Sequence, residues 1–220
     1  TIFGMILLGG ATRLTESGLS MVDWRPIMGV IPPLTEAQWL ATFAEYQQYP
    51  EYQKINQGMD LAGFKQIFLF EYLHRVLGRL IGLMYFVPLV IFALRKMIAP
   101  QLLPTLILLL ILGAAQGMLG WYMVKSGLVD RPSVSQYRLT AHLGVAVAIY
   151  ALMMWLVLRV SSGLSPALKH ISGWGWMLVV GVYTLILSGG FMAGTDAGFA
   201  YPTWPMMGET FVPMGYYAEG

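Results

Sequence analysis

Residues 102–124 read LLPTLILLLILGAAQGMLGWYMV, a stretch without a single charged side chain. A helix needs about 20 predominantly apolar residues to cross the hydrocarbon core of a bilayer, and this stretch has that length. A soluble protein can bury one such helix in its core, but three more stretches of spanning length occur here. They are residues 68–94, 139–158 and 171–193. The sequence therefore predicts an all-α, polytopic membrane protein, with residues 1–11 as the last half of a fifth span.

The composition agrees with this prediction. Hydrophobic residues make up 57% of the 220 residues and charged residues only 11%, too few to cover the surface of a soluble domain. The net charge of +2 is too small to indicate a nucleic acid, so the lipid bilayer is the expected partner. Cysteine is absent, which excludes disulfides, iron–sulfur clusters and thiolate zinc sites.

The connections between the spans predict the orientation. Basic side chains occupy two short connections: Arg95, Lys96, Arg159, Lys169 and His170. The long segment 12–65 and the connection 125–137 lie on the opposite side. Because short basic connections favour the cytoplasm, we expect segment 12–65 on the outer side of the cell (inner) membrane. His170 then belongs to the cytoplasmic charge and is excluded from any site.

The long segment 12–65 contains a predicted helix start. Thr35 is a suitable N-cap, and Trp39, Phe43 and Tyr46 recur after it at helical spacing. Aromatic rings favour the headgroup region of a membrane. We therefore expect a short amphipathic helix that lies on the membrane surface.

A repeated motif predicts an internal duplication. Residues 9–19 read GGATRLTESGL and residues 189–199 read GGFMAGTDAGF, and Trp24 and Trp204 follow at the same offset. Four spans separate the copies, so both run in the same direction, as in parallel repeats of membrane proteins. We expect two four-helix bundles with about five helices in this chain. Residues 1–160 would form the first half and residues 161–220 the start of a second, whose three further helices are missing.

Ionisable side chains cluster within the span 68–94. Glu71, His74, Arg75 and Arg79 fall within an arc of about 140° at 100° per residue. Ionisable groups at membrane depth are costly unless they are paired or face a cavity, so they are candidates for a functional site. The structural alternative is an interfacial Glu–Arg pair with an uninvolved histidine.

A second histidine favours the functional interpretation. At 1.5 Å per residue, His74 lies about 31 Å from Arg95 and His142 about 26 Å from Arg159, so the two have similar depth. Two imidazoles facing each other suit opposite faces of a haem iron, among other metals. Nearby arginines, including Arg138, could pair with haem propionates. The arginine candidates are Arg75, Arg79, Arg131 and Arg138, and Gln116 is a further polar candidate for binding a ligand or a neighbouring helix.

Two rival functions remain open at this point. A b-type electron-transfer cytochrome also uses paired histidines, but it has no evident need for Glu71. A transporter also combines repeats with buried charge. The charges of this chain gather near one side of the membrane, which argues against the transporter.

Several motifs together resemble the haem A synthase family of bacteria and mitochondria. They are GGxTRLTxSGLS (9–20), DWRP (23–26), FEYxHR (70–75), QGxxGWxxVxSGL (116–128), RLxxHL (138–143) and GxxAGxDAG (190–198). The resemblance extends over most of the chain. It implies eight helices in two halves, each with a histidine pair. The loop cysteine pair of some members is absent here.

The resemblance also implies an activity. Members oxidise the C8 methyl of haem O to a formyl group by successive hydroxylations, which makes haem A for terminal oxidases. By this resemblance, His74 and His142 hold haem O through its iron, Glu71 is the catalytic acid, and a haem B cofactor belongs to the missing second half. The expected partners are haem O and an electron donor. Haem O synthase, oxidase assembly factors and a second copy of the chain are further candidates.

Overall fold

The computed structural model describes residues 1–22, 30–128, 132–161, 173–203 and 205–212. Within these ranges the fold is helical, apart from one isolated β-bridge between Met207 and Thr210. The helices in chain order are α1 (Ile2–Leu14), α2 (Glu36–Tyr46), α3 (Pro50–Lys54), α4 (Leu61–Leu94), α5 (Leu103–Gly127), α6 (Gln136–Ser161), α7 (Gly173–Thr195) and α8 (Ala197–Ala200).

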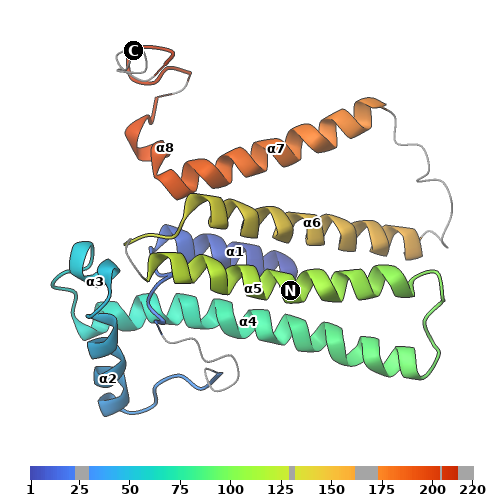
Figure 1. Ribbon diagram of the computed structural model, residues 1–220, viewed down its shortest axis with the longest axis horizontal. Coiled ribbons are helices and arrows are strands. Elements are labelled where there is room, and N and C mark those ends of the chain that lie inside the picture. Colours follow the sequence, from blue (N-terminus) through green and yellow to red (C-terminus); the bar gives the residue numbers. More distant parts are fainter. Residues whose placement is uncertain (23–29, 129–131, 162–172, 204, 213–220) are drawn as a thin grey trace.

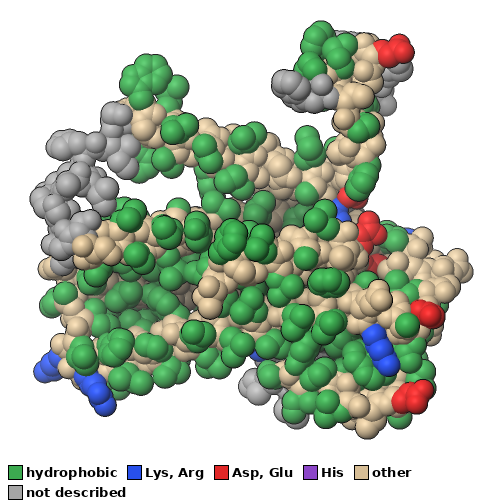
Figure 2. All heavy atoms as spheres, turned by 180° about the vertical axis from the view of Figure 1, so that it is seen from behind, with side chains coloured by type: hydrophobic (Ala, Val, Ile, Leu, Met, Phe, Trp, Pro, Cys, Tyr) green, Lys and Arg blue, Asp and Glu red, His purple; other side chains and the backbone are tan. Residues whose placement is uncertain are grey.

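Four helices confirm the predicted spans. α4, α5, α6 and α7 are long and apolar enough to cross a membrane. Each packs against the next in chain order, α1 packs on α4, and the four lie in a row in Figure 1. The space-filling view in Figure 2 shows mainly hydrophobic side chains along the bundle and charged ones toward its ends. The protein is therefore an all-α, multi-pass membrane protein, as predicted.

Helix α4 is longer than the predicted span because it begins seven residues earlier, at Leu61, after the N-cap Asp60. The carboxylate of Asp60 accepts a hydrogen bond from the Gly63 N–H at 2.8 Å. Its 34 residues correspond to about 51 Å at 1.5 Å per residue. That length exceeds the roughly 30 Å hydrocarbon core of a bilayer. The first turns of α4 therefore form part of a small unit with α2 and α3, at the end of the bundle called the α2–α3 end below.

Helix α2 begins where the sequence predicts. Thr35 is the N-cap, and its hydroxyl and the side chain of Gln38 form a reciprocal capping box. The prediction of a helix lying on the membrane surface was wrong in one respect, because the aromatic face of α2 packs on α4. Trp39 lies edge-on to Phe68, with ring centroids 5.0 Å apart, and Phe43 and Tyr46 contact Phe64. The projecting turns of α4 offer these rings a protein surface, which periodicity within α2 could not reveal.

A carboxyl group is buried inside this aromatic unit. Glu51 of α3 is 4% exposed and accepts a hydrogen bond from the Tyr46 hydroxyl at 3.0 Å. The Asn56 amide donates to the same hydroxyl at 2.8 Å. Burial raises the pKa of Glu51 to about 8, and the charges of Glu71 and Glu16 act in the same direction. Glu51 is therefore a protonation-dependent part of the α2–α3 unit.

We expect the stability of the α2–α3 unit to fall as the pH rises from 4.5 to about 8. In that window folded Glu51 keeps a proton that the unfolded chain has lost, so the folded state binds more protons and is destabilised by rising pH. The effect is a few kcal/mol, at about 1.4 kcal/mol per pKa unit. Hydrogen exchange of residues 36–54, corrected for the intrinsic rate, measures it. Glu51→Gln should remove the pH dependence, whereas exposed Glu45→Gln should keep it. An unchanged pH dependence in Glu51→Gln would contradict the assignment.

The two copies of the repeated motif have the same local geometry. The Thr15 hydroxyl donates to backbone oxygens four and three residues earlier, at 2.8 and 3.5 Å, and Thr195 does the same at 2.9 and 3.3 Å. The next residues, Glu16 and Asp196, both have left-handed backbones, with φ of 50° and 55°. Such a conformation is uncommon outside glycine, so its recurrence is informative.

The repeats also meet in space. The Arg13 guanidinium, in the last turn of α1, donates to the Ala193 carbonyl and pairs with the Asp196 carboxylate at the end of α7. α1 and α7 therefore end on the same side of the bundle, as a parallel repeat requires. The division into halves at residues 1–160 and 161–220 stays a prediction. Trp24 and Trp204 lie outside the described residues.

Candidate functional site

The two predicted histidines lie on helices of the same bundle, each against a glycine of a neighbouring helix. His74 is on α4, and a Cβ added at Gly9 of α1 would lie 3.0 Å from its Cε1. His142 is on α6, and a Cβ added at Gly120 of α5 would lie 3.2 Å from its Cε1. The two side chains are 68 positions apart in the sequence, on helices that both pack against α5.

Both histidines have an enclosed nitrogen without a partner. The Nδ1 atoms of His74 and His142 are buried and make no hydrogen bond to the residues that the structure describes. Buried polar atoms are normally paired, so two such atoms in one bundle require an explanation. At each ring the edge that carries Nδ1 faces a glycine, Gly9 of α1 or Gly120 of α5, so the close approach of these helices accounts for the enclosure.

Glu71 is one turn before His74 and is almost fully buried, at 3% exposure. One carboxylate oxygen accepts hydrogen bonds from the Ser20 hydroxyl at 2.7 Å and from the Met21 N–H at 2.8 Å. The other oxygen pairs with the Arg75 guanidinium. Charged hydrogen bonds of this kind hold an ionised carboxylate firmly. Glu71 therefore joins α4 to the segment that follows α1.

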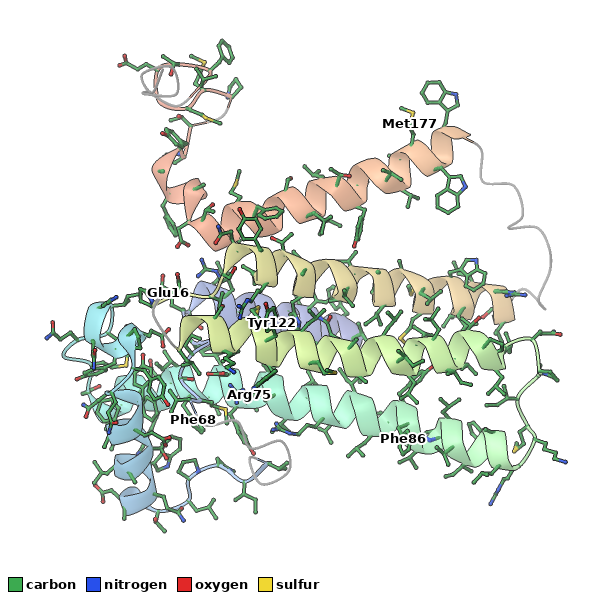
Figure 3. The ribbon with its side chains drawn as sticks, viewed as in Figure 1. Glu16, Phe68, Arg75, Phe86, Tyr122 and Met177 are labelled. Atoms are coloured by element: carbon green, nitrogen blue, oxygen red, sulfur yellow. The ribbon has the colours of Figure 1, made fainter. Side chains whose placement is uncertain are left out.

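The arginines of α4 are integrated into the protein. Arg75 also donates to the Met21 carbonyl at 3.0 Å, so it holds the segment after α1 from two sides. Figure 3 shows Arg75 on the side of α4 that faces α5. Arg79 lies one turn further along α4, and its Nη1 is enclosed by protein. The predicted pairing of these arginines with propionates stays a prediction.

Arg138 and Gln116 connect α5 with α6. The Arg138 guanidinium lies 3.7 Å from the Tyr122 ring centroid and donates to the Tyr122 carbonyl at 2.7 Å. The Gln116 amide donates to the His142 carbonyl at 2.9 Å. Gln116 Oε1 is buried and has no partner among the described residues. Both side chains thus hold α6, and with it His142, in register with α5.

Residues 17–22 cover the α2–α3 end of the bundle. Ser17 and Ser20 are fully buried, and Leu19 packs so closely on Gly127 of α5 that a Cβ there would clash at 2.6 Å. A cavity of about 190 Å³ lies beneath this segment; its lining residues are Met21, Val22, Arg75, Trp121, Val124, Lys125 and Leu128. This volume is below the roughly 300–1,000 Å³ of common ligand pockets. The segment therefore acts as a closely fitted cover.

Sequence reasoning missed three contributors to this site. Ser20, Gly9 and Gly120 were part of the quoted motifs, but nothing in the sequence alone connected them with Glu71 or the histidines. For Ser20, the only available signal in the sequence was its close spacing to Ser17. Arg131, Lys169 and His170 lie outside the described residues.

The donor set fits a haem better than a bare ion. Within the described part of the chain, no group of three or more His, Cys, Asp or Glu side chains is arranged to hold a metal ion. A porphyrin supplies four ligands itself, so two imidazoles complete the coordination of its iron. His74 of α4 and His142 of α6 would be the residues to hold such a group.

These features define an all-α, multi-pass membrane protein with a histidine pair, a buried carboxylate and a fitted cover at one end of its bundle. The chain belongs to the cytochrome oxidase assembly protein family, which it matches over residues 1–218. It is 50% identical to the Heme A synthase of Nitrosospira multiformis, over 96% of this chain and 61% of the relative.

Other relatives agree. The chain is 50% identical to the Heme A synthase of Nitrosomonas eutropha, over 96% of this chain and 61% of the relative, and 49% identical to that of Paramagnetospirillum magneticum, over 98% and 63%. The chain thus spans somewhat less than two thirds of the length of these relatives. No solved structure matches it.

Proposed function

We propose that the protein containing this chain is a haem A synthase, an oxidoreductase that converts the C8 methyl of haem O into a formyl group by successive hydroxylations. The observation that carries the proposal is the pair of imidazoles, His74 and His142, in one helical bundle, with the buried carboxylate of Glu71 one turn before His74. The family membership and the name Heme A synthase of its relatives support it.

His74 and His142 would hold the iron of haem O between α4 and α6. The haem, when bound, would supply the redox chemistry of the reaction. The role of the protein would be to hold the macrocycle in one orientation, so that only one of its methyl groups is oxidised, because positioning contributes a large part of catalysis. Gln116 and Arg138 contribute by holding α6 against α5.

Glu71 is proposed as the catalytic carboxylate, and its surroundings favour an electrostatic role. Its oxygens already accept from Ser20, Met21 and Arg75, so the group is fixed as an anion by preorganised donors. A fixed anion can stabilise positive charge that develops on the substrate carbon. A role in proton transfer would require Glu71 to give up one of these hydrogen bonds.

The remaining assignments follow the same proposal. The histidine pair and residues 12–65 lie on the outer side of the inner membrane, as the basic connection at Arg95 and Lys96 suggests. The partners are haem O and an electron donor. A haem B cofactor would be held by a second histidine pair outside this chain.

Analysis of bound haem tests the proposal directly. The protein is expressed from its complete gene in cells that make haem O, and the extracted haems are separated and identified by mass spectrometry. Haem O together with its hydroxylated product and haem A is the expected result. Unmodified haem B alone would indicate an electron-transfer cytochrome, and the absence of haem would return attention to a transporter.

A further inference from the structure

Among the described glycines, Gly9 and Gly120 are the two whose added Cβ would lie within 4 Å of a site histidine. An added Cβ at Gly9 would lie 3.0 Å from Cε1 and 3.5 Å from Nδ1 of His74. At Gly120 the distances to Cε1 and Nδ1 of His142 are 3.2 and 3.8 Å. The same edge of each ring therefore faces a glycine, although the glycines belong to different helices, α1 and α5.

Neighbouring glycines do not make such contacts. A Cβ at Gly10 of α1, or at Gly113 or Gly117 of α5, would meet no atom within 4 Å beyond its chain neighbours and the adjacent backbone of its own helix. Small residues allow close packing of membrane helices in general. Only Gly9 and Gly120 in this set bring a helix surface against an imidazole, so general helix packing does not account for both contacts.

The orientation of these rings requires a physical cause. Histidines that bind metals usually donate Nδ1–H to a carbonyl or carboxylate, which fixes the plane of the ring. Neither Nδ1 has such a partner among the described residues. The torsion about the Cβ–Cγ bond of histidine is broad and roughly two-fold, so it does not fix the plane by itself. The flat surface at each glycine restricts it instead.

We propose that Gly9 and Gly120 are positioning residues that set the imidazole planes of His74 and His142 for binding the haem iron. The inference rests on the proposed function, since it assumes that the histidines are haem ligands. A methyl group at either position requires the ring to give way by a few tenths of an ångström, because contacts of 3.0 and 3.2 Å are tighter than ordinary packing. Such a movement would change the direction in which the imidazole presents its nitrogen to the iron.

The test compares Gly9→Ala and Gly120→Ala with Gly10→Ala and Gly113→Ala in the protein expressed from its complete gene. Each change places alanine, the better helix former, in the same two helices, so differences report the ring contact. We expect altered electron paramagnetic resonance g values of the ferric haem in the first two variants. Their haem affinity should fall about tenfold or more, as for other residues that orient metal ligands. The control variants should match the wild type.

A haem-free measurement separates this inference from the proposed function. Melting temperatures of the haem-depleted protein are measured for Gly9→Ala, His74→Ala and the double variant, and likewise for Gly120 and His142. The glycine-to-alanine change should lower the melting temperature only when the histidine is present, because the unfavourable contact is between the new methyl group and the imidazole. If this coupling is found but the purified protein binds no haem, the steric contact is supported and haem ligation by the histidines is refuted.

Two results would overturn the inference. One is a set of haem spectra that are identical in all four glycine variants while the histidines prove to be ligands. The other is equal destabilisation by the glycine substitution with and without the histidine. A variant that folds only when the histidine is also removed would support the steric contact.

Discussion

Haem A formation is expected to stop when His142 is replaced by alanine, and equally when His74 is replaced. Loss of residues that merely orient a metal ligand costs about 10–100-fold, so loss of the ligand itself should lower product by at least about 100-fold. The two positions should be equivalent because each imidazole is proposed to supply one ligand to the iron. Mass spectrometry of extracted haems and quantification of bound haem O measure the effect.

A matched control comes from the remaining histidine of the chain. His170 is predicted to lie in a cytoplasmic connection, so His170→Ala should leave haem content and product unchanged. Haem A at wild-type levels in either His74→Ala or His142→Ala would remove that residue from the site. Loss of bound haem in His170→Ala as well would show that the assay responds to any histidine.

Replacement of Glu71 by glutamine is expected to leave haem bound and to lower oxidation of the methyl by at least about 100-fold, the size of effect seen when a preorganised electrostatic group is removed. Glutamine preserves the shape and can still accept from Ser20 and the Met21 N–H. It removes the negative charge, and its amide group would face the Arg75 guanidinium. Haem composition and bound haem are measured together on the purified variant.

Stability must be followed in the same variant. Removing one partner of a buried ion pair costs about 3–5 kcal/mol, so part of any activity loss could reflect unfolding. Ser20→Ala provides the graded comparison, since it removes one hydrogen bond from Glu71, worth about 1.5–3 kcal/mol for a charged acceptor. Its protein should remain folded with an intermediate activity. Intact haem A production by Glu71→Gln would exclude Glu71 from the mechanism.

The distinction between the two roles of Glu71 can be made with these variants. If Glu71 acts as a fixed anion, oxidation of the methyl should fall most in Glu71→Gln, which removes the charge. It should fall less in Ser20→Ala, which removes one of the donors that orient the carboxylate. A proton carrier should instead tolerate loss of the Ser20 hydrogen bond, because a freer carboxyl group exchanges protons more readily. Faster oxidation in Ser20→Ala would therefore favour proton transfer.

The sequence alone determined the class of the protein and most of its helices. Spanning length is a local property of residues 102–124 and its counterparts, and α5 begins and ends within three residues of that prediction. Charge at membrane depth was equally local, and it singled out Glu71, His74 and Arg75 on one turn of helix. The cap at Thr35 and the repeated motif depended only on spacing along the chain.

The partners of these residues were decided by tertiary structure. The position of Glu71 does not reveal that Ser20 and Met21 come to lie on it, because residues 17–22 fold back over the bundle. The aromatic face of α2 was predicted correctly, but its partner was α4 rather than the membrane. Such contacts join residues that are tens of positions apart, and periodicity carries no information on which faces meet.

For the same reason, the sequence could single out the histidines but not the glycines that lie beside them. A histidine is chemically conspicuous, so His74 and His142 could be selected from the sequence and matched by depth. Gly9 and Gly120 carry no functional group, and their neighbours Gly10 and Gly117 look identical in a sequence. Their effect arises only from the rotation and register of α1 against α4 and of α5 against α6. Those quantities follow from the packing of whole helices, which only the folded structure determines.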